Sequence, residues 1–415
     1  MREPLKLRGF RNYWVASTVG FTGLAVTTVA VDVLVIDVLE ASEAQVGIVR
    51  AVQFLPYPLI GLIAGAYVDR WRRRPTLVAF NLAQAVLLLA VPVLFLAGAL
   101  TLTTTAVVLF AVGCCAVFIA AAEQSYLPDL VPRGSLVLAN ARLGQSMTVA
   151  QSAGPALGGL LVSALSAPAA LLATSISRFV SAGLIARIRR PEPPPGAERP
   201  RMWRGIADGL AFAYRHHTLA PLAVSTHMWF LANSIALTVL GLFVLRDLGL
   251  SAIAYGAVLA ATGVGGLLGA LYATRAATRL GEGNTIIASR ALCALTWIAT
   301  AITPGDGTAW VPAVYLGAVQ LVYGFSMGVE DPSEMAYRQA VTPRSMLGRV
   351  NATLRSANRT TAVVGAVVGG ILAGVIGFRP TLLVVAAVFA ASVVVAALSP
   401  VRGARSGGVP APRSA

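Results

Sequence analysis

The chain has almost no lysine. Lys6 is the one lysine among 32 basic residues, and the rest are arginine. A Walker A phosphate loop requires a lysine that reaches the nucleotide phosphates, and Lys6 stands in no such motif. The sequence therefore excludes transport driven by ATP hydrolysis on this chain alone.

Charge of either sign is also scarce. Charged residues make up 12% of the 415 residues, and hydrophobic residues make up 57%. Soluble domains carry about 25% charged residues. Together with a mean hydropathy of +0.76, this composition excludes an ordinary soluble domain and indicates a protein whose main solvent is lipid.

Residues that bind metals are few. The sequence has three cysteines and three histidines, and none of them has the spacing of a metal site. The cysteines fall inside apolar stretches, where they usually serve as small packed side chains. We therefore expect no metal and no cofactor. The six residues are Cys114, Cys115, Cys293, His216, His217 and His227.

Long apolar stretches dominate what is present. Windows of about 20 apolar residues, enough to cross a ~30 Å hydrocarbon core, occur twelve times. The first is too long for the h-region of a signal peptide, so we expect an uncleaved helix. The sequence predicts an all-α membrane protein with twelve transmembrane helices. Their expected spans are 13–38, 44–67, 75–97, 104–124, 143–165, 168–187, 219–245, 252–274, 285–303, 310–329, 357–377 and 379–398.

One segment of the chain occurs twice. Residues 123–161 and 334–372 coincide at 12 of 39 positions when the first is shifted by 211 without a gap. A repeat of half the chain indicates a duplicated bundle, and parallel repeats in a membrane protein place a transport site at their interface. We therefore expect a transporter with two pseudo-symmetric six-helix halves. Coinciding residues include Glu123 with Glu334, Tyr126 with Tyr337, and Gly154, Gly158 and Gly159 with Gly365, Gly369 and Gly370.

The two halves are expected at residues 1–187 and 218–399. The linker between them, 188–217, contains a proline-rich run that can form neither a helix nor a central strand. An amphipathic helix on the membrane surface follows it. Residues 400–415 are predicted to be disordered. The apolar face of the linker helix would consist of Trp203, Ile206, Leu210 and Tyr214.

Basic residues are distributed unevenly between the loops. Of the 32, 28 lie in segments that an even count of spans, starting inside, places in the cytoplasm, or at the cytoplasmic ends of spans; the exceptions are Arg50, Arg178, Arg246 and Arg379. The positive-inside rule then puts both termini in the cytoplasm of an inner-membrane protein. The net charge of +15 thus reflects topology and indicates no nucleic-acid partner. We expect a monomer whose partners are membrane lipids, protons and a small-molecule substrate.

A charged loop joins the second and third spans. It reads Gly65-Ala-Tyr-Val-Asp69-Arg70-Trp-Arg72-Arg73-Arg74 and resembles the loop signature of the major facilitator superfamily, with Arg72 in place of the family's last glycine. Positive-inside charge explains the arginines but not an acid four residues after Gly65. The resemblance implies a cytoplasmic gate. Its expected residues are Gly65, Asp69, Arg70, Arg73 and, from the second repeat, Glu334.

The fifth span contains Gly154-Pro155-Ala-Leu-Gly158-Gly159. This resembles the end of the motif found in antiporter members of the superfamily, although two upstream glycines of that motif are alanines here. Proline kinks a spanning helix, and glycine pairs allow close crossing. Helix packing alone would account for the glycines. The second half has Ala366 where the first has Pro155, and this one-sided proline favours an exporter.

The resemblance extends over nearly the whole chain. Leu7-Arg8-Gly9-Phe10-Arg11, Val131-Pro132-Arg133 and Leu347-Gly348-Arg349-Val350 are similar to the enterobactin-exporter and macrolide-efflux branch. This similarity implies a transporter, not an enzyme, that works by alternating access. It would export an amphipathic small molecule, such as a drug, an antibiotic or a siderophore-like compound, in exchange for protons.

Acidic residues inside the spans need a reason, because each costs about 2.5–3.5 kcal/mol or more in the hydrocarbon. Asp32 shares one face of the first span with Thr28, and the family's first helix lines the central cavity. Asp32 is therefore a candidate to carry the coupling proton; the alternative is a gate residue near the outer headgroups. Glu123 is the second proton candidate. Both repeated acids, Glu123 and Glu334, are either gate residues paired with loop arginines or solvated helix-end charges.

Other polar residues within the spans are candidates for buried contacts or for a ligand site. Arg178, near the middle of the sixth span, needs an acidic or carbonyl partner. Aromatic, amide and thioether groups on the seventh and tenth spans suit a bulky, partly apolar ligand, and they would equally serve helix packing. The candidates for lining a cavity are Thr28, Trp229, Asn233, Gln320, Tyr323 and Met327.

Two alternative functions stay open. One is a proton-coupled symporter that imports a nutrient, against which the glycine-proline motif of the fifth span argues. The other is a membrane-embedded enzyme that uses His216 and His217. No acid or cysteine stands near that pair in the sequence, and such an enzyme would leave the repeat unexplained.

Overall fold

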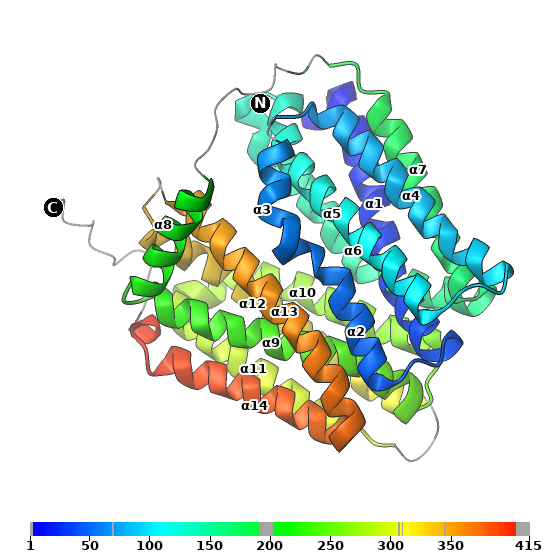
Figure 1. The fold of residues 1–415 in the computed structure, drawn as a ribbon. Coiled ribbons are helices and arrows are strands. Elements are labelled where there is room, and N and C mark those ends of the chain that lie inside the picture. Colours follow the sequence, from blue (N-terminus) through cyan, green and yellow to red (C-terminus); the bar gives the residue numbers. More distant parts are fainter. Residues whose placement is uncertain are drawn as a thin grey trace. The chain divides into compact units, whose positions relative to one another are not determined.

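A computed structural model of the chain describes residues 3–68, 70–190, 192, 202–305, 308, 310–343 and 346–403. Within these residues the regular structure is helical throughout, without a β-strand (Figure 1). Ten of the described helices are long and apolar enough to cross a membrane. The expected all-helical membrane protein is thus confirmed.

The helices group into two compact units. Unit 1 comprises Met1–Pro200 with Val244–Ala260, and unit 2 comprises Arg201–Phe243 with Ala261–Ala415. The predicted domain boundaries stay a prediction. The first helices are α1 (Arg8–Val33), α2 (Glu43–Phe54), α3 (Pro56–Val68), α4 (Arg73–Leu96), α5 (Leu102–Leu130), α6 (Leu136–Leu165) and α7 (Ala167–Ala186). The later ones are α8 (Met202–Arg215), α9 (Leu219–Leu242), α10 (Ala252–Leu280), α11 (Glu282–Ala301), α12 (Trp310–Val341), α13 (Leu347–Ile376) and α14 (Phe378–Ala397).

Each unit contains the same set of helix contacts. In unit 1, α1 packs against α6 and α7, and α4 packs against α5 and α7 (Figure 1). In unit 2, α9 packs against α13 and α14, and α11 packs against α12 and α14. A serine side chain joins one pair of corresponding helices in each unit, with the donor and acceptor helices exchanged. Ser181 Oγ donates to the Ala16 carbonyl at 2.8 Å, and Ser225 Oγ donates to the Ser392 carbonyl at 2.7 Å.

Two of the twelve expected spans do not correspond to any of the ten long apolar helices. The expected span 44–67 is divided into α2, with 12 residues, and α3, with 13 residues. Pro56 begins α3, a position where its missing amide hydrogen is tolerated. The other is α11, which carries Arg290 together with several serines and threonines. Asp69 and residues 193–201 of the linker lie outside the described residues.

The linker helix α8 packs against α9 and α13 in unit 2. A Cβ at Gly209 would lie 2.9 Å from the Arg349 carbonyl oxygen on α13, so the absence of a side chain at Gly209 allows the two helices to approach closely. Ala213 is fully buried beside Leu219 and Leu354. Tyr214, on the expected apolar face, stays 39% exposed. The side chains of the first turns of α8, including Trp203 and Ile206, lie outside the described residues.

Glycines in α6 allow α1 to approach closely. A Cβ at Gly154 would overlap the side chain of Ala25, and one at Gly158 would lie 3.1 Å from the Val26 carbonyl oxygen. On another face of α6, a Cβ at Gly256 of α10 would overlap the Pro155 carbonyl oxygen. The glycines of the sequence motif thus have a packing role within unit 1.

A second close crossing joins α10 and α12 in unit 2. A Cβ at Gly265 would overlap the Leu321 carbonyl, and one at Gly324 would overlap the Thr262 carbonyl. Gly269 and Gly328 repeat this arrangement one turn further on. Small residues four apart on both helices are the usual means by which spanning helices bring their backbones together.

This crossing predicts opposite effects of one substitution at two sites on α12. Gly324→Ala should lower stability by about 1–3 kcal/mol, because the new methyl group meets backbone that cannot move away. Gly317 has open space around it, so Gly317→Ala should be neutral or stabilising by up to about 1 kcal/mol. Thermal unfolding of the two purified variants in detergent measures the difference. Equal melting temperatures would contradict the crossing.

Candidate functional site

Asp32 is buried near the end of α1 and held by two partners. Arg50 Nη2 lies 2.6 Å from Asp32 Oδ1 and 2.7 Å from Oδ2. Tyr255 Oη donates to Oδ2 at 2.6 Å. Asp32 is 7% exposed, and a buried carboxylate is stable only with such partners. We call Asp32, Arg50 and Tyr255 the Asp32 latch; it joins α1, α2 and the first turn of α10 within unit 1.

A second arginine binds the turn after α1. A π-helical turn, Leu34–Val38, ends this helix. Arg246 Nη2 donates to the carbonyls of Ile36 at 2.8 Å and Ala41 at 2.7 Å, and its Nη1 lies 3.4 Å from Glu43. Of these two, the Ile36 carbonyl belongs to the end of a helix, where the last carbonyls lack helical partners, so Arg246 stabilises this turn. The prediction that Asp32 carries the coupling proton stays a prediction, and its carboxylate is here part of a closed ion pair.

The start of α4 is capped by an acid from beyond α7. Glu192 accepts hydrogen bonds from the backbone N–H groups of Arg73 at 2.6 Å and Arg74 at 3.0 Å. A carboxylate at a helix N-terminus satisfies free amides and interacts favourably with the helix dipole. The Arg73 side chain lies 3.5 Å from Asp129 on α5, whereas Arg70 is exposed. Among the expected gate residues, Arg73 is thus bound to α5; Asp69 lies outside the described residues.

Unit 1 contains a cavity of about 140 Å³ that is lined by both polar and apolar side chains. Glu123 from α5 and Arg178 from α7 line it, together with Asn81 and Gln84 from α4. Arg178 Nη1 donates to Asn81 Oδ1 at 3.4 Å, and Glu123 and Arg178 attract one another electrostatically. Within the described residues, Arg178 Nε and Gln84 Oε1 have no hydrogen-bond partner. Apolar lining comes from Phe21, Leu24, Ile119 and Ile185.

A fully buried arginine organises unit 2. Arg290 on α11 is 0% exposed. Its Nε donates to Glu330 Oε1 at 2.7 Å, and its Nη2 donates to Glu334 Oε2 at 3.2 Å. Two hydroxyls of α9 complete its surroundings: Thr226 Oγ1 accepts from Nη2 at 2.9 Å, and Ser225 Oγ accepts from Nη1. We call these five residues the Arg290 cluster.

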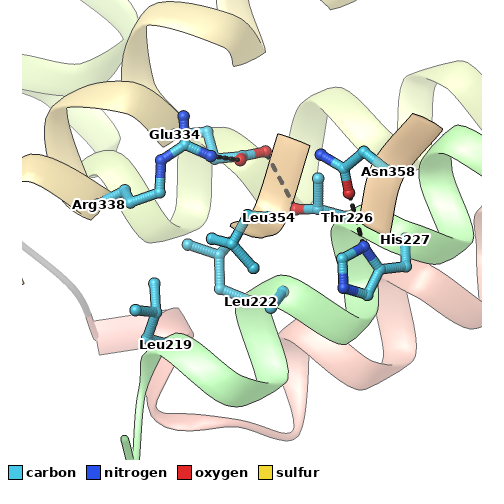
Figure 2. Close-up of a pocket in the computed structure, with 9 residues that line it drawn as sticks. Leu219, Leu222, Thr226, His227, Glu334, Arg338, Leu354 and Asn358 are labelled. Carbon is cyan, nitrogen blue, oxygen red and sulfur yellow. Dashed lines mark hydrogen bonds and ion pairs between the residues drawn. The ribbon is translucent and has the colours of Figure 1, made fainter. Parts of the chain in front are cut away.

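A small pocket of about 10 Å³ lies beside Glu334 (Figure 2). Such a volume holds roughly one water molecule. Glu334 is paired with Arg338 at 3.2 Å and accepts a hydrogen bond from Thr226 at 3.1 Å. His227 forms another wall; its Nδ1 lies 2.6 Å from Asn358 Oδ1, and its Nε2 lies 2.6 Å from Tyr214 Oη on α8. His227 therefore connects α8, α9 and α13.

The residues expected to line a cavity in the seventh and tenth spans lie mostly in helix contacts of unit 2. Tyr323 Oη donates to Asn233 Oδ1 at 2.6 Å. Gln320 is 1% exposed, and its Nε2 donates to Thr300 Oγ1 at 3.4 Å. Trp229 is 7% exposed and packs edge-on against Phe389. Met327 is half-buried, and Thr28 of unit 1 is exposed. Their role toward a ligand stays a prediction.

His216 has a structural role. Its Nδ1 accepts from the backbone N–H groups of Thr218 at 3.4 Å and Leu219 at 3.3 Å, at the start of α9. Burial and the neighbouring His217 lower the pKa of His216, which keeps Nδ1 free to accept. His216 therefore stabilises the turn between α8 and α9.

Sequence reasoning missed the most buried charges. Arg290 stands near the cytoplasmic end of the expected span 285–303, and the structure buries it in α11. Glu330 stands one turn before the repeated acid Glu334 and outside the duplicated segment, so the repeat did not point to it. Arg50 was noticed as a base outside the cytoplasmic loops. Its contact with Asp32 joins two helices, and such contacts are not visible in apolar periodicity.

The Asp32 latch predicts non-additive stability effects. Arg50→Gln should lower stability by about 3–5 kcal/mol, because it leaves a buried carboxylate without its counter-ion. Adding Asp32→Asn should recover part of that loss, since the uncompensated charge is removed. Thermal unfolding of both single variants and the double variant completes the cycle. Strictly additive losses would contradict the latch.

Comparison with known proteins agrees with this architecture. The sequence profile of a family described as transmembrane secretion effectors matches residues 2–411. The multidrug efflux pump Tap of Mycolicibacterium fortuitum is 28% identical over 404 residues, which cover 92% of each chain. A solved bacterial homologue of the human lysosomal transporter Spinster matches with a TM-score of 0.74 at 15% identity, over 99% of this chain and 100% of that one.

A further solved structure, the nucleoside transporter NupG, matches with a TM-score of 0.73 at 16% identity, over 94% of this chain and 97% of that one. At such identities the solved structures show a common fold and nothing of the substrate. The profile match over nearly the whole chain carries the assignment: this chain is a transporter of the major facilitator superfamily and belongs to its transmembrane secretion effector family.

Proposed function

We propose that the protein exports an amphipathic small molecule from the cytoplasm in exchange for protons. The observation that carries the proposal is the similarity to a multidrug efflux pump along 92% of both chains. Because that similarity covers both units, it bears on a complete transport mechanism. Drugs, antibiotics and siderophore-like compounds form the substrate class.

The proposal includes twelve spans. α2 and α3 together would form one of them, since their combined length is sufficient to cross a ~30 Å core. α11 would form another, with Arg290 hidden from lipid by its partners. Six spans would precede the linker and six would follow it, with both termini in the cytoplasm of the inner membrane. Alternating access would then move one six-helix half against the other.

The cavity of unit 1 supports an amphipathic substrate. Its wall combines the Glu123–Arg178 charge pair with apolar side chains such as Phe21 and Ile119. Apolar lining with a few placed polar groups is the usual chemistry of a small-molecule site. The unpartnered Gln84 Oε1 and Arg178 Nε offer one acceptor and one donor to a ligand or to water.

Transport in inside-out membrane vesicles tests direction and coupling together. In such vesicles the lumen corresponds to the outside of the cell. An exporter that exchanges substrate for protons should concentrate a fluorescent amphipathic cation in the lumen when the lumen is acidified. A proton-coupled importer would instead release substrate from the lumen. Vesicles without the protein provide the baseline, and accumulation that ignores the pH gradient would refute proton antiport.

The same assay predicts the behaviour of Asp32→Asn. If Asp32 carries the coupling proton, gradient-driven accumulation should fall to the baseline while downhill exchange of substrate continues. The reason is that a proton shifts a conformational equilibrium only if the two states bind it with different affinity. Tyr255→Phe is the matched control, because it removes one hydrogen bond of the latch and leaves the acid in place. Gradient-driven accumulation that survives Asp32→Asn would place the proton elsewhere.

A further inference from the structure

Glu330 belongs to the Arg290 cluster, and one of its two carboxylate oxygens has no hydrogen-bond partner there. It is 3% exposed, and its Oε1 accepts from Arg290 Nε at 2.7 Å. Its Oε2 is buried and has no hydrogen-bond partner within the described residues. An ionised oxygen in that position has lost its hydration without replacement, which is costly. A proton on Oε2 removes this charge.

Two acids compete for the guanidinium of Arg290. Glu330 Oε1 lies 2.7 Å from Arg290 Nε, and Glu334 Oε2 lies 3.2 Å from Arg290 Nη2. Glu334 has a second counter-ion, Arg338 at 3.2 Å, whereas Arg290 is the one arginine that Glu330 contacts among the described residues. The neighbouring Asp331 is exposed and adds a further negative charge nearby. Like charges at such short range resist joint ionisation, so a proton bound at Glu330 is energetically coupled to Glu334.

Among the described residues, Arg290 is the one cation that acts on Glu330, and the other charges that act on it are acids. From α11 it faces the thiol of Cys293, and from α12 the hydroxyl of Tyr323. The α9 groups of the cluster, Ser225 and Thr226, are uncharged hydroxyls. His227 of α9 acts on Glu334. The arginines are therefore the counter-ions within this part of unit 2.

Water can reach the cluster at Glu334. The pocket beside this residue has room for about one water molecule and is lined by Thr226, His227 and Arg338 as well (Figure 2). Glu330 lines no part of it. Both acids share the guanidinium of Arg290. Protonation of Glu334 therefore changes how strongly Glu330 binds its proton.

We propose that the Arg290 cluster is a proton-binding site of unit 2, in which Glu330 holds one exchangeable proton. Uptake converts hydronium and the carboxylate into water and the neutral acid, and release reverses that step. Arg290 stays charged throughout. When Glu330 is neutral, Glu334 becomes the main counter-ion of Arg290. As a source of the coupling proton, the site rests on the proposed antiport; as a proton site, it stands on the geometry alone.

Infrared difference spectroscopy during a pH titration of the purified protein tests the site directly. A protonated carboxylic acid has its own carbonyl stretching band, which an ionised acid lacks. Wild type should show this band and lose it as the pH rises. Glu330→Gln should remove it, while keeping an oxygen that accepts from Arg290 Nε. Asp208→Asn, an acid on α8 with a side chain that is 47% exposed, should leave the band unchanged.

Glu334→Gln provides a second, directional variant. It removes a negative charge beside Glu330, so ionisation of Glu330 becomes easier and the band should disappear at a lower pH than in wild type. This variant also keeps the proposal testable if Glu330→Gln fails to fold. The absence of a titrating band in wild type, or an unchanged band in Glu330→Gln, would overturn the proposal.

Transport measurements separate the site from the proposed function. In inside-out vesicles, Glu330→Gln should lose pH-driven accumulation and retain downhill exchange. Full pH-driven accumulation in this variant would overturn the coupling role. Wild-type transport that ignores the pH gradient would instead refute proton antiport, and the infrared result would still decide whether Glu330 binds a proton.

Discussion

A charge inside the hydrocarbon of a membrane must be surrounded by opposite charges and dipoles from the protein, because lipid offers none. The structure meets this requirement to different degrees. The carboxylate of Asp32 has bonds from both Arg50 and Tyr255. Arg290 has an acceptor for each of its nitrogens, whereas its partner Glu330 has an oxygen without one. A charge with all its partners fixes a helix arrangement, whereas the unpartnered oxygen of Glu330 is where we propose that a proton binds.

Close helix packing brings these partners around each buried charge. The hydroxyls that accept from Arg290 come from α9, and the acids come from α12. Backbones brought together at glycine positions, as at Gly265 and Gly324, hold α12 in a fixed register against a neighbouring helix. Lipid does not drive helices together, so the small residues and the buried polar bonds have to do so jointly. The same residues thus serve stability and charge placement.

Much of the fold could be predicted from the sequence, and less of the site. Apolar runs and the duplicated segment predicted an all-helical transporter, because length and repetition are local properties of the chain. The break before Pro56 is a local feature that apolar length does not show, because α2 and α3 are both apolar. Asp32 and Glu123 stood out as acids in apolar surroundings. Their partners did not, because Tyr255 is 223 residues from Asp32 and apolar periodicity does not show which helix a side chain faces.

Two π-helical turns of the chain bear on how it evolved. One follows α1 at Leu34–Val38 and the other follows α9 at Phe243–Asp247, and they lie 209 positions apart. Shifted by the same 209 positions, Ser42 and Gly47 after the first turn coincide with Ser251 and Gly256 after the second. A π turn is a rare departure from the α-helix, so two independent gains at the same place would be a coincidence. The simplest history is that an ancestral six-helix protein already possessed the turn, and that both copies inherited it when its gene doubled.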